Sequence, residues 1–463
     1  MEYFRQAKRN LNSFVEPTVK RYNLDTLDIA IVSVVLYFFV VFLWRNFHLF
    51  PQKAYWIGLK RRIVQRFLKI SFVTAKIDTQ IKKVTDMARE NFRKGNPATI
   101  KYELGEKGIS WEEIDQKLAI LTAPDRVIKE NGKLSGMYYA PRENNFEKNI
   151  VDRAGEYLYF NLLHVDKLLG IRQIESELIS FFLKLLKTDS NCVGSTTCGG
   201  TESILIAIYS MREYAFATKG ITEPELILCE TAHPAFYKAC NYFKIKAVRV
   251  PMDKKTFTMD MNFFKKRITS NTIGAVGSAI NYPHGLVDPL EDMAKVLKPY
   301  NIPIHADCCL GGYSMIFAKE LGFDVQDGTF SNPGITTISI DPHKYGMAPK
   351  GISLLLFRNP EMKKAGIFVQ EDWVGGMYGT ACVTGSKPSA SVAGAWIASQ
   401  VVGKAGLRDA AKRMHDCLME LKRELLKIPG IKIIGNPQFN TLAFYLEGHK
   451  FDTTQLAVGL MKR

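Results

Sequence analysis

The chain has 463 residues, 46% hydrophobic and 23% charged. This composition excludes wholesale disorder and leaves room for roughly two or three domains. The formal net charge is +16, and +11 of it comes from positions 45–101, which hold 14 basic and 3 acidic residues. The eight cysteines include no zinc-type CxxC pair, so we interpret them as reduced thiols that bind no metal.

An apolar stretch precedes the basic segment. Residues 27–44 (LDIAIVSVVLYFFVVFLW) carry one charge in 18 residues, and that length is about what a hydrocarbon core of ~30 Å requires. No small-residue cleavage site follows, which favours a retained transmembrane helix over a signal peptide or a buried core helix. Five lysines and arginines lie in 45–62 and three in 9–26, so the positive-inside rule predicts a short lumenal tail at 1–26 and a cytosolic C-terminal part.

The segment 45–110 is predicted to be a basic, helical juxtamembrane segment that lies against anionic headgroups. Nucleic-acid binding is the competing interpretation of such a charge run. We reject it because the run directly abuts the predicted membrane span. A capping box formed by Ser110 and Glu113 then opens the next helix. Residues 111–170 form an N-terminal segment that includes a glycine-punctuated loop with two tyrosines.

From position 171 onward, helical and strand patterns alternate. Helices are predicted at 171–187, 202–217, 233–243, 260–268 and 289–300, and strands at 225–229, 247–250, 273–279 and 302–308. Short apolar strands separated by helices indicate crossover units and a mostly parallel sheet, hence an α/β fold. Further helices are predicted at 390–402 and 407–427, with strands at 431–434 and 441–446.

The stretch 336–351, TTISIDPHKYGMAPKG, combines a β-branched run with adjacent His343 and Lys344 and a second lysine, Lys350. A lysine at the end of a buried strand is expected to lose its proton more easily than a surface lysine, because burial disfavours the ammonium. That property suits Schiff-base chemistry on a carbonyl, above all on pyridoxal phosphate. A surface turn with ordinary basic residues is the competing interpretation.

Three other features are predicted at strand ends of the same sheet, where ligands of such folds bind. Gly200 and Thr201 lie in a glycine turn at a helix N-terminus, which favours a phosphate. His233 begins another helix and could stack on an aromatic cofactor. Asp307 closes a strand and could pair with a pyridinium nitrogen. Together with Lys344, these features predict a pyridoxal phosphate site.

Four segments carry a family resemblance: CGGTESI (198–204), TAHPAF (231–236), HADCCLGG (305–312) and ISIDPHKYGMAPKG (338–351). They resemble the sphingosine-1-phosphate lyases, which are pyridoxal phosphate enzymes related to the group II decarboxylases. The resemblance implies fold type I, with a large cofactor-binding domain at 171–370. It also implies an inter-subunit loop and a partial C-terminal small domain at 371–463, truncated relative to the family.

The resemblance also implies residue roles. Lys344 would bond the cofactor's aldehyde, His233 would stack on its ring and Asp307 would hold its nitrogen. The cofactor phosphate would be held by Gly200, Thr201 and His343. Gly375 and Gly376, in the WVGGMY loop at 373–378, would reach the phosphate in the other subunit of a homodimer. Tyr139, His164 and Lys350 would bind substrate, and Lys344, Lys350 and Tyr282 are the candidate catalytic residues, with the identity of the general base left open.

The implied reaction is retro-aldol cleavage of a phosphorylated long-chain sphingoid base to phosphoethanolamine and a fatty aldehyde. We expect it at the endoplasmic reticulum membrane, with the catalytic domain facing the cytosol. Two positions depart from the family pattern: Pro342 replaces a small polar residue, and Cys308 replaces an alanine. The alternatives are a pyridoxal phosphate-dependent amino-acid decarboxylase, or an inactive membrane-bound paralogue owing to the short C-terminus.

Overall fold

The computed structural model describes residues 78–79, 82, 85–86, 104–123, 125–126, 136–141, 143–164, 166–188, 191–448, 456 and 459. The predicted lumenal tail and the membrane span at 27–44 lie outside these residues. Within the described part of the chain, no helix is both long and apolar enough to cross a membrane. The predicted domain boundaries stay predictions.

The chain divides into two compact units, Met1–Val127 and Ile128–Arg463. In the first unit, helix α5 (Trp111–Leu121) begins where the capping box predicts. Its N-cap Ser110 accepts a hydrogen bond from the backbone N–H of Glu113 at 3.2 Å. This contact satisfies one of the free N–H groups at the start of the helix.

The second unit is built on a seven-stranded sheet of order β1-β7-β6-β5-β4-β2-β3. Its strands are β1 (Val193–Thr197), β2 (Glu225–Cys229), β3 (Lys246–Val250), β4 (Thr272–Ser278), β5 (Ile304–Asp307), β6 (Ile335–Ile340) and β7 (Ser353–Phe357). Only β7 runs against the others, and it pairs with β1 on one side and β6 on the other. The predicted mostly parallel sheet is therefore confirmed.

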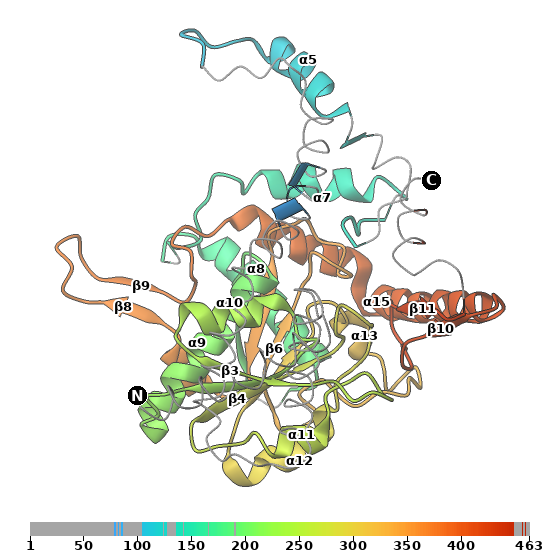
Figure 1. The fold of residues 1–463 in the computed structure, drawn as a ribbon. Helices are drawn as coiled ribbons and strands as arrows, with labels where there is room; N and C mark the ends of the chain where they lie inside the picture. Colours follow the sequence, from blue (N-terminus) through green and yellow to red (C-terminus); the bar gives the residue numbers. More distant parts are fainter. Residues whose placement is uncertain are drawn as a thin grey trace, which may run out of the picture. The chain divides into compact units, whose positions relative to one another are not determined.

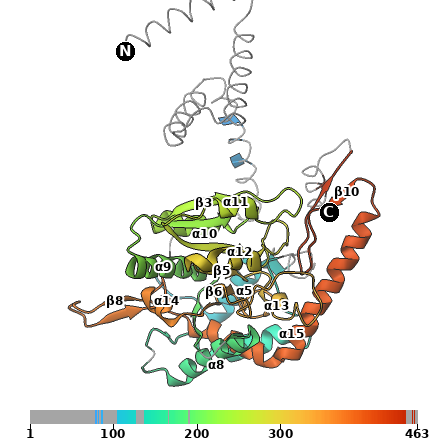
Figure 2. The same ribbon diagram turned by 90° about the horizontal axis from the view of Figure 1, so that it is seen from below.

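Helices cover both faces of this sheet (Figures 1 and 2). One core cluster joins the sheet to α7 (Phe146–Gly155), α8 (Leu169–Leu185), α12 (Leu290–Leu297) and α15 (Ser389–Leu426). The other cluster joins it to α9 (Gly200–Lys219), α10 (Pro234–Tyr242) and α14 (Pro360–Ala365). The shorter helices are α11 (Met261–Lys265), α13 (Gly312–Met315) and the 3₁₀ turn η1 (Lys298–Tyr300).

Strand β7 shows why a strand buried on both faces has a continuous apolar sequence. Leu354 and Leu356 belong to the first core cluster, whereas Leu355 and Phe357 belong to the second. Because successive side chains of a strand point to opposite faces, a strand covered on both sides needs an apolar residue at nearly every position. The sheet is thus the centre of a three-layer core.

Three elements differ from the sequence prediction or refine it. Strand β1 was not predicted, because its sequence, VGSTT, is largely polar. The predicted helices 390–402 and 407–427 form two arms of α15, which has a non-helical backbone at Gly403, with φ 62° and ψ 173°. A positive φ of this size favours glycine. The C-terminal strands form a separate ribbon, β10 (Ile431–Ile433) with β11 (Phe444–Leu446).

A second unpredicted feature is the hairpin of β8 (Phe368–Gln370) and β9 (Tyr378–Thr380). It projects from the sheet and its helices in both views (Figures 1 and 2). Its tip carries Trp373, Val374 and Met377, all of which are exposed. The tip is the loop that the resemblance assigns to a subunit contact.

Candidate active site

The functional residues converge at the carboxyl edge of the sheet, around a cavity of about 620 Å³. Eight of the lining residues were predicted from the sequence: Tyr139, Gly200, Thr201, His233, Tyr282, Asp307, His343 and Lys344. These residues follow strands β1, β2, β4, β5 and β6 or lie in the loop before α7. Parallel strands place their carboxyl ends at one edge, which brings together residues far apart in the sequence.

Lys344 lies in the turn after β6 and forms a buried ion pair. Its Nζ is 2.9 Å from Oδ2 of Asp341, and His343 Nε2 is 3.6 Å from the same oxygen. Burial alone would lower the pKa of Lys344, but the charge of Asp341 outweighs burial and the pKa is raised. The expectation that Lys344 loses its proton easily is therefore wrong for the protein without a ligand. The sequence could not show that a carboxylate would face the ammonium.

Asp307 ends β5 with its carboxylate largely buried, the residue being 7% exposed. Its Oδ1 accepts hydrogen bonds from the backbone N–H of Cys309 at 3.1 Å and from Oγ of Ser339 at 3.3 Å. Among the described residues, no donor contacts Oδ2. One oxygen of Asp307 is thus fixed by the protein, and the other can receive a ring N–H from a ligand in the cavity.

A hydrogen-bonded chain continues behind Asp307. The Nε2 atom of His305 lies 3.1 Å from Ser339 Oγ, and Nδ1 lies 2.9 Å from Thr337 Oγ1. Burial lowers the pKa of His305 to about 4, so the ring is neutral. Because Ser339 donates to Asp307, it must accept from His305 Nε2–H, and Nδ1 then accepts from Thr337. Every donor in this hydrogen-bonded chain therefore points toward Asp307: Thr337 donates to His305, His305 to Ser339, and Ser339 to the Asp307 carboxylate.

The variant Ser339→Ala tests this chain. It removes a donor to Asp307 and leaves the Nε2–H of His305 without its acceptor, and a buried unpaired polar group costs about 1–3 kcal/mol. We expect the affinity for pyridoxal 5′-phosphate, measured by absorbance titration, to fall about tenfold. Ser176→Ala is the control, because the Ser176 hydroxyl donates to its own exposed helix at 2.9 Å. Equal affinities of wild type and Ser339→Ala would contradict the role of the chain.

The glycine turn after β1 leads directly into helix α9. A Cβ atom on Gly200 would lie 2.8 Å from Asp341 Oδ2 and 2.9 Å from Cys309 Sγ, so only glycine fits there. Gly200 and Thr201 are the first two residues of a 20-residue helix, where backbone N–H groups are free and the helix dipole favours an anion. This is a suitable seat for a phosphate group.

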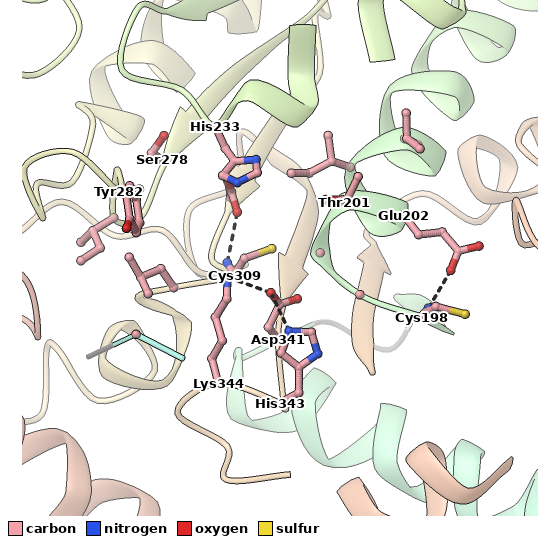
Figure 3. Close-up of a pocket in the computed structure, with 18 of the residues that line it drawn as sticks. Cys198, Thr201, Glu202, His233, Ser278, Tyr282, Cys309, Asp341, His343 and Lys344 are labelled. Atoms are coloured by element: carbon pink, nitrogen blue, oxygen red, sulfur yellow. Dashed lines mark hydrogen bonds and ion pairs between the residues drawn. The ribbon is translucent and has the colours of Figure 1, made fainter. Parts of the chain in front are cut away.

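His233 enters the cavity from the side opposite Lys344 (Figure 3). It is the N-cap of α10, and its Nδ1 accepts a hydrogen bond from the backbone N–H of Ala235 at 3.2 Å. The bond fixes the orientation of the ring and leaves Nε2 as the protonated nitrogen. A planar ring held in this way can stack on an aromatic ligand.

Tyr139, Tyr282 and Lys350 lie at the outer part of the site. Tyr282 lines the cavity and is 74% exposed. Burial raises the pKa of Tyr139, although Lys344 opposes this effect. Lys350 Nζ lies 4.5 Å from the centre of the Tyr139 ring and donates to the backbone oxygen of His343 at 3.1 Å. Lys350 is therefore next to the cavity, though not among its lining residues.

Three predicted site residues are not brought to this cavity within the described chain. His164 is exposed, in the turn between α7 and α8. Gly375 and Gly376 lie at the tip of the β8–β9 hairpin, also away from the cavity lining. Their roles stay predictions.

Three residues of the site, Asp341, Ser339 and Glu202, were not predicted from the sequence. Asp341 is buried, and its Oδ1 has no hydrogen-bond partner among the described residues. The sequence shows that Asp341 lies three residues before Lys344, but it does not show that the two side chains meet across the turn. Ser339 contacts Asp307, 32 positions away, and Glu202 contacts Val383, 181 positions away, and no local pattern reveals either contact.

The geometry fits pyridoxal 5′-phosphate. One cavity is lined by a lysine Nζ, by a carboxylate oxygen that accepts from no described residue, and by a glycine cradle at a helix N-terminus. An imidazole ring faces the same space (Figure 3). The lysine suits the aldehyde of the cofactor and the carboxylate suits its pyridine nitrogen. The glycine cradle suits the phosphate, and the imidazole suits the aromatic ring.

Comparison with known proteins agrees with this geometry. Residues 172–447 match the pyridoxal-dependent decarboxylase conserved domain. The chain is 37% identical over 379 residues to the sphingosine-1-phosphate lyase of Oryza sativa subsp. japonica, covering 80% of this chain and 69% of that protein. It is 35% identical over 412 residues to sphingosine-1-phosphate lyase 1 of Rattus norvegicus, covering 88% and 71%.

A solved structure, the sphingosine-1-phosphate lyase Bpss2021 of Burkholderia pseudomallei K96243, has a TM-score of 0.75 and 30% identity. The match covers 79% of this chain and 84% of that one. The glutamate decarboxylase of Lactobacillus brevis, with a TM-score of 0.63 and 20% identity, shares the fold. The α/β fold of type I is therefore confirmed, and the chain belongs to the sphingosine-1-phosphate lyase family, whose cofactor is pyridoxal 5′-phosphate.

Proposed function

We propose that this protein cleaves the C2–C3 bond of a phosphorylated long-chain sphingoid base, releasing phosphoethanolamine and a long-chain aldehyde. The observation that carries the proposal is the convergence of Lys344, Asp307, His233 and Gly200 on one cavity of a chain from the lyase family. The cavity is open at Tyr282, which gives a long-chain substrate a route in.

Each residue has a proposed task toward the cofactor. Lys344 bonds the aldehyde, the free oxygen of Asp307 holds the ring nitrogen, and His233 stacks on the ring. Gly200, Thr201 and His343 hold the phosphate. When bound, the cofactor supplies an electron sink for the pair released by the breaking bond.

The outer residues have proposed tasks toward the substrate. Lys350 and Tyr139 hold the substrate phosphate, and His164 contributes to the same region. Lys344 and Tyr282 can hold or move the protons of the reacting hydroxyl and carbon. His343 and Asp341 confine the Lys344 ammonium, so that its Nζ stays directed into the cavity.

We also propose a homodimer with shared sites and a membrane anchor. The exposed apolar tip of the β8–β9 hairpin supports the dimer, because a lone hairpin rarely leaves such side chains in water. The apolar span 27–44 and its flanking charges support an anchor in the endoplasmic reticulum membrane with a cytosolic catalytic unit. An anchor suits a substrate that enters from the bilayer surface.

The test uses the full chain purified in detergent and supplied with pyridoxal 5′-phosphate. We expect visible absorbance from the lysine-bound cofactor and, after sphingosine-1-phosphate is added, a fatty aldehyde product. Absence of the absorbance would overturn the proposal. Absorbance without aldehyde, together with carbon dioxide release from an amino acid, would favour the decarboxylase alternative.

Lys350 provides a test of substrate recognition. The variant Lys350→Met removes a compact positive charge suited to a phosphate but keeps the side-chain length. We expect the KM for the phosphorylated substrate to rise about tenfold, equivalent to about 1.4 kcal/mol, while cofactor affinity stays unchanged. Lys350→Arg keeps the charge and should recover part of the loss. An unchanged KM in Lys350→Met would show that another group binds the phosphate.

A further inference from the structure

A buried glutamate joins two distant parts of the cavity wall. Glu202, the third residue of helix α9, is only 8% exposed. Its Oε2 accepts a hydrogen bond from the backbone N–H of Cys198 at 2.6 Å (Figure 3), and its Oε1 accepts from Val383 at 2.8 Å and Thr384 at 3.2 Å. One carboxylate thus links the glycine turn to a segment more than 180 positions later in the chain.

The three backbone N–H groups stabilise the buried Glu202 carboxylate, as the cation of an ion pair would. Among the described residues, no lysine or arginine forms an ion pair with Glu202, and the nearby Lys387 pairs with Glu175 instead. A buried carboxylate needs strong hydrogen bonds to offset its desolvation, and bonds from N–H groups to a charged oxygen are stronger than neutral ones. The start of α9 adds a favourable dipole.

Within the described part of the chain, the segment that Glu202 holds makes few other polar contacts with the glycine turn and β1. The Val383 side chain is 59% exposed. The Sγ of Cys382 lies 3.8 Å from the backbone oxygen of Thr196, and the Sγ of Cys198 lies 3.7 Å from Thr384 Oγ1. Both distances are long and involve sulfur, which forms weak hydrogen bonds. The carboxylate therefore provides the strongest polar contacts of this segment with the glycine turn.

The segment matters because of its position. Val383 and Thr384 line the same cavity as Gly199 and Gly200, and they follow the β8–β9 hairpin directly. We propose that Glu202 is a positioning residue that ties the Val383–Thr384 segment to the glycine turn, so that cofactor affinity and the placement of the hairpin depend on each other. The proposal rests on the cofactor site proposed above.

The geometry explains why a glutamate is required. An aspartate carries the same charge but is one methylene shorter, so it cannot reach Cys198 and Val383 at once. A glutamine has the right length, but its NH₂ group would face one of the N–H donors and lose that contact. Both variants should therefore break the bridge, although only Glu202→Gln removes the charge.

The experiment compares Glu202→Gln and Glu202→Asp with wild type in the full chain. We expect both variants to bind pyridoxal 5′-phosphate about tenfold more weakly in an absorbance titration. We also expect the amides of Val383 and Thr384 to exchange with deuterium about tenfold faster in the cofactor-free protein. Glu213→Gln is the matched control on the same helix, where Glu213 pairs with its neighbour Arg212 at 3.4 Å.

The outcomes separate the possible roles. If Glu202→Asp has the cofactor affinity and amide exchange of wild type, the carboxylate acts only by stabilising the helix N-terminus, and the proposal is overturned. Unchanged amide exchange in both Glu202→Gln and Glu202→Asp would overturn it as well. If the Glu202 variants do not fold, Val383→Pro removes one donor from an exposed position, and the same loss of affinity is expected. A wild-type chain that binds no cofactor would refute the proposed site, while the exchange measurement would still test the bridge.

Discussion

Replacing Lys344 by alanine is expected to abolish the visible absorbance of the lysine-bound cofactor and to lower turnover by at least about three orders of magnitude. Lys344 is the lysine that lines the cavity, within 2.9 Å of Asp341, and it faces the same space as His233 and the glycine turn. The absorbance spectrum and an aldehyde assay measure the two effects independently.

The matched control for this variant is Lys364→Ala. Lys364 is an exposed lysine that pairs with Glu361 at 2.7 Å, on the surface of helix α14. Its loss should leave both the spectrum and the turnover unchanged, because surface ion pairs contribute little to stability. If the absorbance persisted in Lys344→Ala, a different lysine would bond the cofactor, and Lys350 would be the next to replace.

Asp307→Asn is expected to reduce turnover by about two to three orders of magnitude, in the range found when one preorganised electrostatic contact is removed. The asparagine has nearly the same shape, and its carbonyl oxygen can still accept the N–H of Cys309, so the fold should survive. What the variant removes is the negative charge that, under the proposed function, would keep a bound ring nitrogen protonated.

Turnover, cofactor affinity and the melting temperature should be measured together for this variant. A large drop in turnover with a small change in melting temperature would show that the charge acts on the chemistry. Asp409→Asn is the control, because Asp409 forms an exposed pair with Arg413 at 3.3 Å. Turnover equal to that of wild type would mean that Asp307 does not stabilise the bound ring.

Whether a strand could be predicted from the sequence depended on the length and continuity of its apolar run. Strands β2 and β4 were predictable because strands buried on both faces have largely apolar sequences. Strand β1 was missed because VGSTT has few apolar residues. The β8–β9 hairpin was missed because each of its strands has only three residues, and its sequence was interpreted as a loop.

The residues of the site also fall into those that a local sequence pattern predicts and those that it does not. Lys344, Asp307, His233 and Gly200 follow strands or begin helices, so their positions in the chain already placed them at one edge of the sheet. Asp341 raises the pKa of Lys344, and that effect follows only from the three-dimensional contact. Glu202 was visible inside the GGTES motif, but its two partners in the 383–384 segment come from a different part of the chain.

The antiparallel strand β7 also fixes when the site can form during synthesis. Strand β1 pairs only with β7 in the sheet, and β7 is made more than 150 residues later. A ribosome that has just added Lys344 has synthesised every residue from Gly200 to Lys344, yet the glycine turn still has no neighbouring strand to hold it. Contacts this distant in sequence form slowly and leave an unpaired edge exposed. We therefore expect the nascent chain to bind its cofactor only after β7, the last strand of the sheet, has emerged.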